Sequence, residues 1–448
     1  MLILASESIG AELNPFIMLP FVGMLLSIAI LPLVRPVWFE HLRNKGIVAA
    51  IFGVPVLAYL AIEFGGEGYH EILLTGEEYI SFIIYLAALF VIAGGIYLSG
   101  DTLGTPRNNA LFLTVGAALA NLVGTTGAAM LMVRPLLRAN SDRVHKKHVF
   151  IFLIFIVCNT AGLLTPIGDP PLFLGFLRGI SFLWTLQLWP QWIITFAILI
   201  AVFILMDRYY FKKEHAGVKT VADKASREPI RIHGGINFLF LGGVIASVYI
   251  SGQWGPENGG PVEWWMRDVA LVFFVLLSLF LGPREPRQRN EFSWNPIGEV
   301  AIIFAGIFAS MIPALAILKA RGAEFGIDQP WQFFWLTGGL SSFLDNAPTY
   351  LVFTSLAQGL LGLENFSDLM SATVIPGIGY SPAAFLAAIS TGAVFMGANS
   401  YIGNAPNFMV KSIAEEKGVK MPNFFAYIAW AAIILIPVFV LTMFLFFL

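Results

Sequence analysis

The stretch "LLTPIGDPPLFLG", residues 163–175, places an aspartate between a glycine and two prolines inside an otherwise apolar segment. Proline removes a backbone donor and clashes with the preceding turn, so a helix cannot run through this stretch unbroken. Non-helical backbone in a bilayer is tolerated only where protein buries it or where it lines a cavity. A carboxylate such as Asp169 is costly there and by default indicates function. The stretch therefore predicts a broken membrane helix that carries a binding site.

The composition places the whole chain in the membrane class. Of its 448 residues, 57% are hydrophobic and 12% are charged, whereas about a quarter are charged in soluble domains. Apolar runs of 18 or more residues recur from end to end, which predicts an all-α polytopic membrane protein. We find no catalytic constellation and no phosphate-binding loop, so we expect neither an enzyme nor a cofactor. The basic stretch 212–233 lacks interleaved aromatic residues, so nucleic-acid binding is not expected.

Ten apolar segments are long enough to cross a bilayer. Two further segments, 109–137 and 331–359, are interrupted near their middles by "LVGTTGA" and "SSFLDNAPT". Their arms are too short to cross a bilayer singly, so we predict re-entrant hairpins. The predicted spans are 16–34, 46–63, 79–99, 148–179, 190–211, 235–253, 267–282, 298–318, 383–410 and 423–448.

The distribution of basic residues supports this arrangement, because Lys and Arg accumulate in cytoplasmic loops. With both hairpins re-entrant, both termini lie outside, on the periplasmic side of a bacterial inner membrane. Only four basic residues then fall in outside loops, and the acidic loop 63–78 lies outside too. The inside loops hold 21 of the 26 Lys and Arg residues: 35–45, 100–108, 138–147, 207–233, 283–297 and 411–422.

An internal repeat accompanies this topology. "PIGDPPLFLG" at 166–175 is echoed by "YIGNAPNFMV" at 401–410, and each lies in the span that follows a hairpin. Each half would hold five transmembrane helices and one hairpin, in opposite orientations, which is the inverted-repeat plan of secondary transporters. The predicted parts are a first repeat, a cytoplasmic linker and a second repeat, at 1–211, 212–234 and 235–448. Their broken helices are 148–179 and 383–410.

The helix breaks and hairpin tips supply the predicted ion or substrate site. Freed carbonyls together with Thr and Asn oxygens would suit an alkali cation, and Asp169 and Asp345 are the predicted Na⁺ ligands, where Na⁺ and a proton would compete. Structural alternatives remain open, since either aspartate could cap the helix after it, the threonines could satisfy a turn, and the asparagines could join helices. The predicted binding residues are Thr125, Thr126, Asn159, Thr165, Asp169, Asp345, Asn346, Thr349, Asn399, Ser400 and Asn404.

Residue chemistry favours exchange of Na⁺ or Li⁺ for protons over carriage of an anion. A carboxylate substrate such as citrate would need positive charge, and the deepest basic residue, Arg134, lies towards the cytoplasm. The alternative is Na⁺- or H⁺-coupled transport of an organic anion such as citrate or a dicarboxylate, held by amides and hydroxyls at the hairpin tips. A channel is disfavoured by the repeat and by the absence of a continuous polar span.

The segments "SSFLDNAPTYLVF" and "NTAGLLTPIGDPPLFLGFLRG" resemble the ion transporter superfamily, over nearly the whole chain. The closest resemblance is to its NhaD-type sodium/proton antiporter branch, which also carries the label of citrate transporter. The resemblance implies a homodimer in which a transport domain of hairpins and broken helices moves like an elevator against a scaffold domain. In the dicarboxylate carriers each hairpin tip reads Ser-Asn-Thr. Here the tips read "GTT" at 124–126 and "DNA" at 345–347, a departure that suits the antiporters better.

Overall fold

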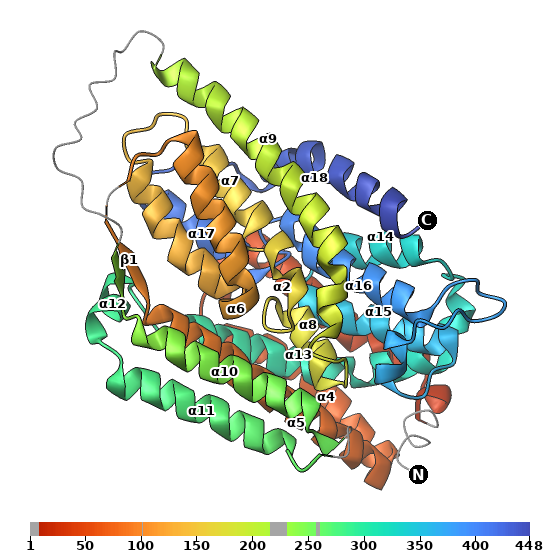
Figure 1. Ribbon diagram of the computed structural model, residues 1–448. Coiled ribbons are helices and arrows are strands. Elements are labelled where there is room, and N and C mark those ends of the chain that lie inside the picture. Colours follow the sequence, from red (N-terminus) through yellow and green to blue (C-terminus); the bar gives the residue numbers. More distant parts are fainter. Residues whose placement is uncertain (1–8, 101, 216–230, 257–259) are drawn as a thin grey trace.

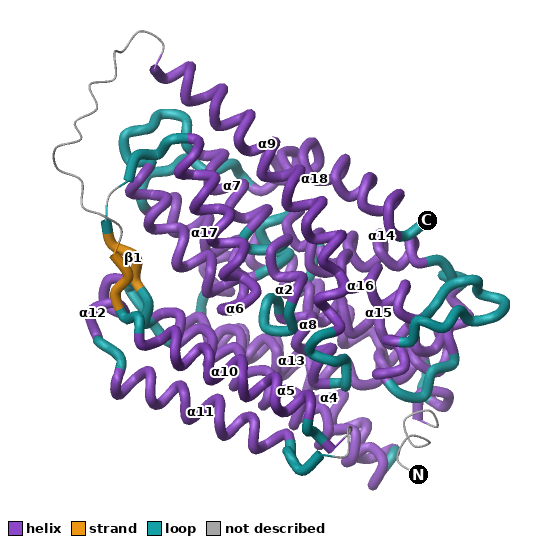
Figure 2. Tube along the Cα trace, viewed as in Figure 1, coloured by secondary structure: helices purple, strands orange, loops and turns teal. Residues whose placement is uncertain are grey.

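The computed structural model describes residues 9–100, 102–215, 231–256 and 260–448. Most of this part is helical, and its two short strands, β1 and β2, lie at one edge of the molecule (Figure 2). Eleven helices of the described part are long and apolar enough to span a membrane. The protein is therefore an integral membrane protein of the all-α class.

The first half of the chain runs from η1 to α9, and α9 is the long helix at the upper edge of Figure 1. Its elements are η1 (Pro15–Met18), α2 (Leu19–Val34), α3 (Pro36–Phe39), α4 (Leu42–Glu63), α5 (Gly65–Gly94), β1 (Tyr97–Ser99), α6 (Pro106–Ala139), α7 (Lys147–Ile156), η2 (Thr160–Leu164), α8 (Pro170–Leu177), η3 (Trp184–Leu188) and α9 (Trp189–His215).

The second half begins with a strand and ends with a long apolar helix, and α10 and α11 lie side by side along one edge (Figure 1). Its elements are β2 (Arg231–His233), α10 (Ile236–Gln253), α11 (Trp264–Leu281), α12 (Arg284–Arg289), α13 (Asn295–Arg321), η6 (Gly322–Phe325), α14 (Pro330–Ser341), α15 (Asn346–Leu361), η7 (Phe366–Met370), α16 (Pro382–Met396), η8 (Gly397–Asn399), α17 (Ala405–Glu416) and α18 (Phe424–Phe446).

Helix α6 folds back on itself at Gly124. This glycine has φ 74° and ψ 158°, a conformation that other residues rarely adopt. A straight helix would separate Asn109 from Asn140 by about 46 Å, at 1.5 Å per residue. Instead their amides exchange hydrogen bonds of 3.0 and 2.8 Å. The element is therefore a hairpin whose two ends meet, although by length and composition it counts as one of the eleven candidate spans.

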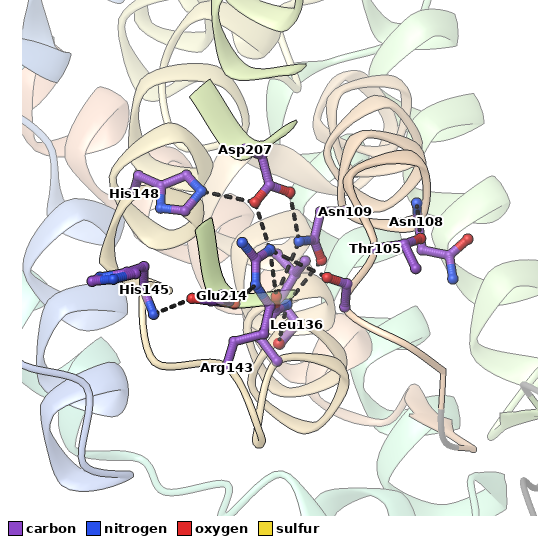
Figure 3. A network of polar contacts seen from close by, with 11 residues as sticks. Thr105, Asn108, Asn109, Leu136, Arg143, His145, His148, Asp207 and Glu214 are labelled. Carbon is purple, nitrogen blue, oxygen red and sulfur yellow. Dashed lines mark hydrogen bonds and ion pairs between the residues drawn. The ribbon is translucent and has the colours of Figure 1, made fainter. Parts of the chain in front are cut away.

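A buried carboxylate fastens the open end of this hairpin. Asp207 of α9 accepts a 2.9 Å hydrogen bond from the Asn109 amide. Its carboxylate also forms an ion pair with Arg143 at 2.5 Å. His148, at the start of α7, lies 2.9 Å from the same carboxylate. Figure 3 shows Asp207 between these three side chains. This network holds both ends of α6 against α7 and α9.

Helices α14 and α15 form a second hairpin. Phe333 near the start of α14 packs edge-to-face on Phe353 in the middle of α15, with 6.3 Å between the ring centroids. The two residues are nearly equidistant from the turn at 342–345, so the helices run antiparallel. Neither helix exceeds 16 residues, which is short of the roughly 20 needed to cross a bilayer.

The helix breaks share one backbone conformation. Asp169 precedes α8 with φ −144° and ψ 143°, and Asn404 precedes α17 with φ −153° and ψ 139°. In both, the preceding glycine, Gly168 or Gly403, packs against the carbonyl of a glycine six residues earlier, where a side chain would clash. The echoed sequence motifs thus build the same local structure twice.

Two predicted boundaries were wrong. The helix that contains the predicted span 79–99 begins earlier, because most of the predicted acidic loop, residues 65–78, is helical within α5. Glutamate has a good helix propensity, which allows this. The helix also ends earlier, at Gly94, since Tyr97–Ser99 pairs as a strand with Arg231–His233. Within the predicted linker 212–234, α9 continues to His215 and Arg231–His233 forms a strand, whereas residues 216–230 lie outside the described residues.

Candidate functional site

Asp169 is the residue on which the site converges. Its side chain is 1% exposed and receives hydrogen bonds from three separate segments of the chain. Thr125 at the tip of α6 donates its hydroxyl proton to Oδ1 over 2.8 Å. Asn346 at the start of α15 donates to Oδ2 over 2.5 Å, and Asn404 donates to Oδ1 over 3.1 Å. Both hairpins and both helix breaks therefore meet at one carboxyl group.

No basic side chain of the described residues forms an ion pair with Asp169. Removing a carboxylate from water costs several kcal/mol even after the protein relaxes. Each hydrogen bond to a charged group returns roughly 1.5–3 kcal/mol. Three such bonds offset much of this cost, but they supply no positive charge. The group is consequently suited to a proton or a small cation.

Backbone contacts fix the tip of α6 against the first break. The Thr125 amide donates to the carbonyl of Gly168 over 2.9 Å. Tyr85 of α5 donates its phenolic proton to the carbonyl of Ile167 over 2.7 Å, and its ring stacks on Phe173 of α8 at 3.6 Å. Freed carbonyls at the break are thus paired within the protein, as an apolar environment demands.

The two aspartates differ in what they do locally. Asp169 makes no capping hydrogen bond to α8, so the structural-cap alternative for this residue is wrong. Asp345 does cap α15, because its Oδ1 accepts from the Ala347 amide over 3.0 Å. It also lines the cavity described below. Asp345 therefore both caps α15 and lines the cavity.

A chain of amides extends from Asp169 to the second break. Asn404 lies 3.4 Å from Oδ1 of Asn159. Asn159 donates to Oδ1 of Asn407 over 2.8 Å. Asn407 in turn donates to the carbonyls of Gly397 and Ser400 over 2.8 and 2.9 Å. This chain connects the break before α8 with the break before α17.

A second polar cluster forms where the other hairpin meets the second break. Ser400 donates to the carbonyl of Ser342 over 2.5 Å, and Asn399 donates to the Ser342 hydroxyl over 2.9 Å. The Asn399 side-chain oxygen is buried and has no partner among the described residues. The predicted residues Asn399 and Ser400 therefore lie in this cluster, without a hydrogen bond to Asp169.

Two of the predicted binding residues donate hydrogen bonds to backbone carbonyls near the site. The Thr165 hydroxyl donates to the carbonyl of Asn121 over 2.6 Å, which ties the break to the first arm of α6. The Thr349 hydroxyl donates to the carbonyl of Asp345 over 2.9 Å, within its own helix. Neither hydroxyl points its proton at Asp169.

A cavity of about 390 Å³ opens beside this carboxyl group. Thr125, Thr126, Asp345 and Asn404 line it on one side. Helices α5 and α13 line the other side, where Glu299 pairs with Lys45 at 2.7 Å. Among the described residues no lysine or arginine lines the cavity. Its chemistry is that of hydroxyls, amides, carboxyls and apolar side chains.

The sequence analysis missed Asn407 and Ser342. Asn407 lies three residues after Asn404, so a helix places both on one face, and that spacing could have identified it. Ser342 lies in the quoted segment "SSFLDNAPT" beside Asp345. Asn346 and Asn404, from the second half of the sequence, both donate to Asp169 in the first half.

Two substitutions separate the capping role of the Asp345 side chain from its negative charge. Asparagine is as good an N-cap as aspartate, and replacing a cap by alanine costs about 1 kcal/mol. We expect Asp345→Asn to keep the unfolding midpoint of the detergent-purified protein and Asp345→Ala to lower it. Thermal unfolding measures both. Equal losses in the two variants would show that the hydrogen bond to Ala347 does not stabilise α15.

Comparison with known proteins identifies the family. Over residues 10–447 the chain matches the family that carries the description "Putative citrate transport". No match was found among curated proteins. Because the match covers nearly the whole chain, it applies to the hairpins, the breaks and the cavity together. The protein therefore belongs to this citrate transport family, and it is a secondary transporter and not an enzyme.

Proposed function

We propose that the protein carries out cation-coupled transport of citrate or a similar carboxylate anion, with Asp169 holding the coupling cation, Na⁺ or a proton. The observation that carries this proposal is the buried Asp169 carboxyl group, which three segments hold by hydrogen bonds and no basic side chain of the described residues neutralises. The family description supports citrate as the substrate.

Electrostatics explain why transport would be coupled. A carboxylate anion enters a cavity whose acidic lining groups are Asp345 and Glu299, and which no lysine or arginine of the described residues lines. Two like charges about 4 Å apart repel by about 4 kcal/mol at the effective dielectric of a partly buried site. A proton or Na⁺ at Asp169 removes one negative charge before the anion arrives. The anion then binds well only to the cation-loaded protein, which prevents uncoupled movement.

Alternating access follows from the way that the two hairpins share Asp169. We propose that α6 and α14–α15 are re-entrant and belong to inverted repeats, 1–211 and 235–448, in an inner membrane with both termini outside. The matched backbone at Asp169 and Asn404 supports a repeat. The resemblance noted in the sequence analysis supports a homodimer with an elevator motion of the transport domain. Because both hairpins donate hydrogen bonds to the Asp169 carboxyl group, the transport domain would move as a unit.

Exchange of Na⁺ for protons is the second candidate, and it was the first preference of the sequence analysis. The absence of lysine and arginine from the described cavity lining favours it, since such a cavity suits cations without any organic substrate. The family match favours citrate transport over this candidate.

Transport by reconstituted protein tests the two candidates against each other. Proteoliposomes with a trapped pH dye would receive labelled citrate under an inward Na⁺ gradient, an inward proton gradient, or neither. We expect citrate to accumulate under at least one gradient and not in its absence. Alkalinisation of acid-loaded vesicles by Na⁺, without any citrate uptake, would instead establish exchange.

The variant for this assay is Asp169→Asn. Asn404 has nearly the same backbone conformation, so asparagine fits such a break and the variant should fold. We expect gradient-driven citrate accumulation to fall to the background of empty vesicles, because the amide binds neither Na⁺ nor a proton as a carboxylate does. Gradient-driven accumulation equal to that of the unmodified protein would refute the role of Asp169.

Asn407→Ala tests the amide chain. The change leaves the Gly397 and Ser400 carbonyls and Asn159 without their partner, and an unpaired buried group costs roughly 1–3 kcal/mol. We expect the concentration of coupling cation that gives half-maximal citrate uptake to rise by about tenfold, since 1.4 kcal/mol corresponds to that factor. The readout is uptake against cation concentration.

A matched control exists in Asn237. It is equally buried, donates to the Gly95 and Gly234 carbonyls, and accepts from Ser278, away from the site. We expect Asn237→Ala to lower thermal stability to a similar extent and to leave the half-maximal cation concentration unchanged. A similar change of cation dependence in both variants would mean that Asn407 acts only through stability.

A further inference from the structure

A second cavity, of about 560 Å³, lies at the end of the molecule where α7 begins and α9 ends. It is separate from the cavity beside Asp169, because the two share no lining residue. Three lysines and two histidines contribute to it, and no acidic residue of the described part does. Its lining consists of Val144, His145, Lys146, Lys147, His148, Tyr210, Gly418, Val419 and Lys420.

The buried acidic residues near the cavity are already paired, and Asp142, two residues before Val144, is exposed. Glu214 pairs with Arg143 at 3.2 Å and accepts from the backbone amide of His145. Asp207 is held by the network of Figure 3. Glu415 pairs with Lys411 at 2.7 Å, on α17. Lys146, Lys147 and Lys420 therefore form no ion pair with a described carboxylate.

The lysines remain available to a ligand. The Lys147 ammonium lies 5.7 Å from the centre of the Trp430 ring, and Lys146 donates to the carbonyl of Ser141 over 2.8 Å. Both contacts leave protons of each ammonium group free, since it carries three. Lys420 and Lys147 are exposed. Several positive groups thus converge on one cavity from two parts of the chain.

The apolar surroundings indicate that the ligand has acyl chains. Val144, which lines the cavity, is 80% exposed. Lys147 of the lining lies over the Trp430 ring of α18, a helix apolar enough to span a membrane. Tryptophan and exposed apolar residues next to lysines are typical of the depth at which lipid headgroups lie. Basic pockets between membrane helices at this depth bind anionic headgroups.

We propose that this cavity binds the phosphate-bearing headgroup of an anionic phospholipid, with Lys146, Lys147 and Lys420 as its ligands. The acyl chains would leave past Val144 into the bilayer. His148 lines the cavity and also touches Asp207, whose carboxylate holds the open end of hairpin α6 (Figure 3). The bound headgroup therefore lies one side chain away from the network that fastens this hairpin.

Native mass spectrometry of the full-length protein tests this site, with phosphatidylglycerol or phosphatidylcholine added to the detergent micelles. We expect the protein to retain phosphatidylglycerol in preference. The double variant Lys147→Gln/Lys420→Gln should weaken that binding by roughly 25-fold, since each lysine beside an anionic lipid contributes about a fivefold factor. Binding equal to that of the unmodified protein would overturn the proposal.

The control is Lys212→Gln/Lys213→Gln, which removes the same charge from exposed positions on α9 outside the cavity lining. It should retain phosphatidylglycerol, and equal losses in the two double variants would mean diffuse attraction without a site. Inorganic phosphate and citrate serve as soluble competitors. Displacement of the lipid by either at millimolar concentration would assign the cavity to a soluble anion and overturn the lipid assignment.

Discussion

One buried carboxyl group organises the centre of this transporter. Asp169 accepts hydrogen bonds from the tip of α6, from the start of α15 and from the break before α17, which are far apart in the sequence. If these donors moved away, the carboxylate would be left in an apolar interior without partners, at a cost of several kcal/mol. The two hairpins and the two breaks are therefore held together by one requirement, the solvation of one charge.

The same requirement connects structure to transport. Protein groups alone supply Asp169 with dipoles, and in the described part they supply it with no positive charge. A cation that completes the site also changes the charge felt in the adjoining cavity, which Asp345 lines. In the proposed function, cation binding and anion binding would be linked through Coulomb's law, because no basic side chain of the described residues pairs with Asp169.

Much of the fold and of the candidate site could be predicted from the sequence, and the features that could not be predicted have physical reasons. Prolines and Asp169 in an apolar segment predicted the broken helix, and the echoed motif indicated that Asn404 occupies an equivalent position. The sequence could not show that Asn346 and Asn404 turn towards Asp169, since that depends on how the hairpins pack. The spacing from Asn404 could have identified Asn407, but the sequence could not show its partners, which are backbone carbonyls freed only by the break. The strand at Tyr97–Ser99 was missed because its partner, Arg231–His233, is more than 130 residues away.

The most direct test is the protonation state of Asp169, measured by difference infrared spectroscopy of the purified protein in lipid. A protonated carboxyl group absorbs at a carbonyl frequency that is distinct from that of a carboxylate. We expect this band at low pH in the absence of Na⁺. It should disappear when the pH is raised or when Na⁺ takes the place of the proton, and it should be missing from the Asp169→Asn variant. A band that the variant retains unchanged, or its absence from the unmodified protein at every pH, would contradict the account.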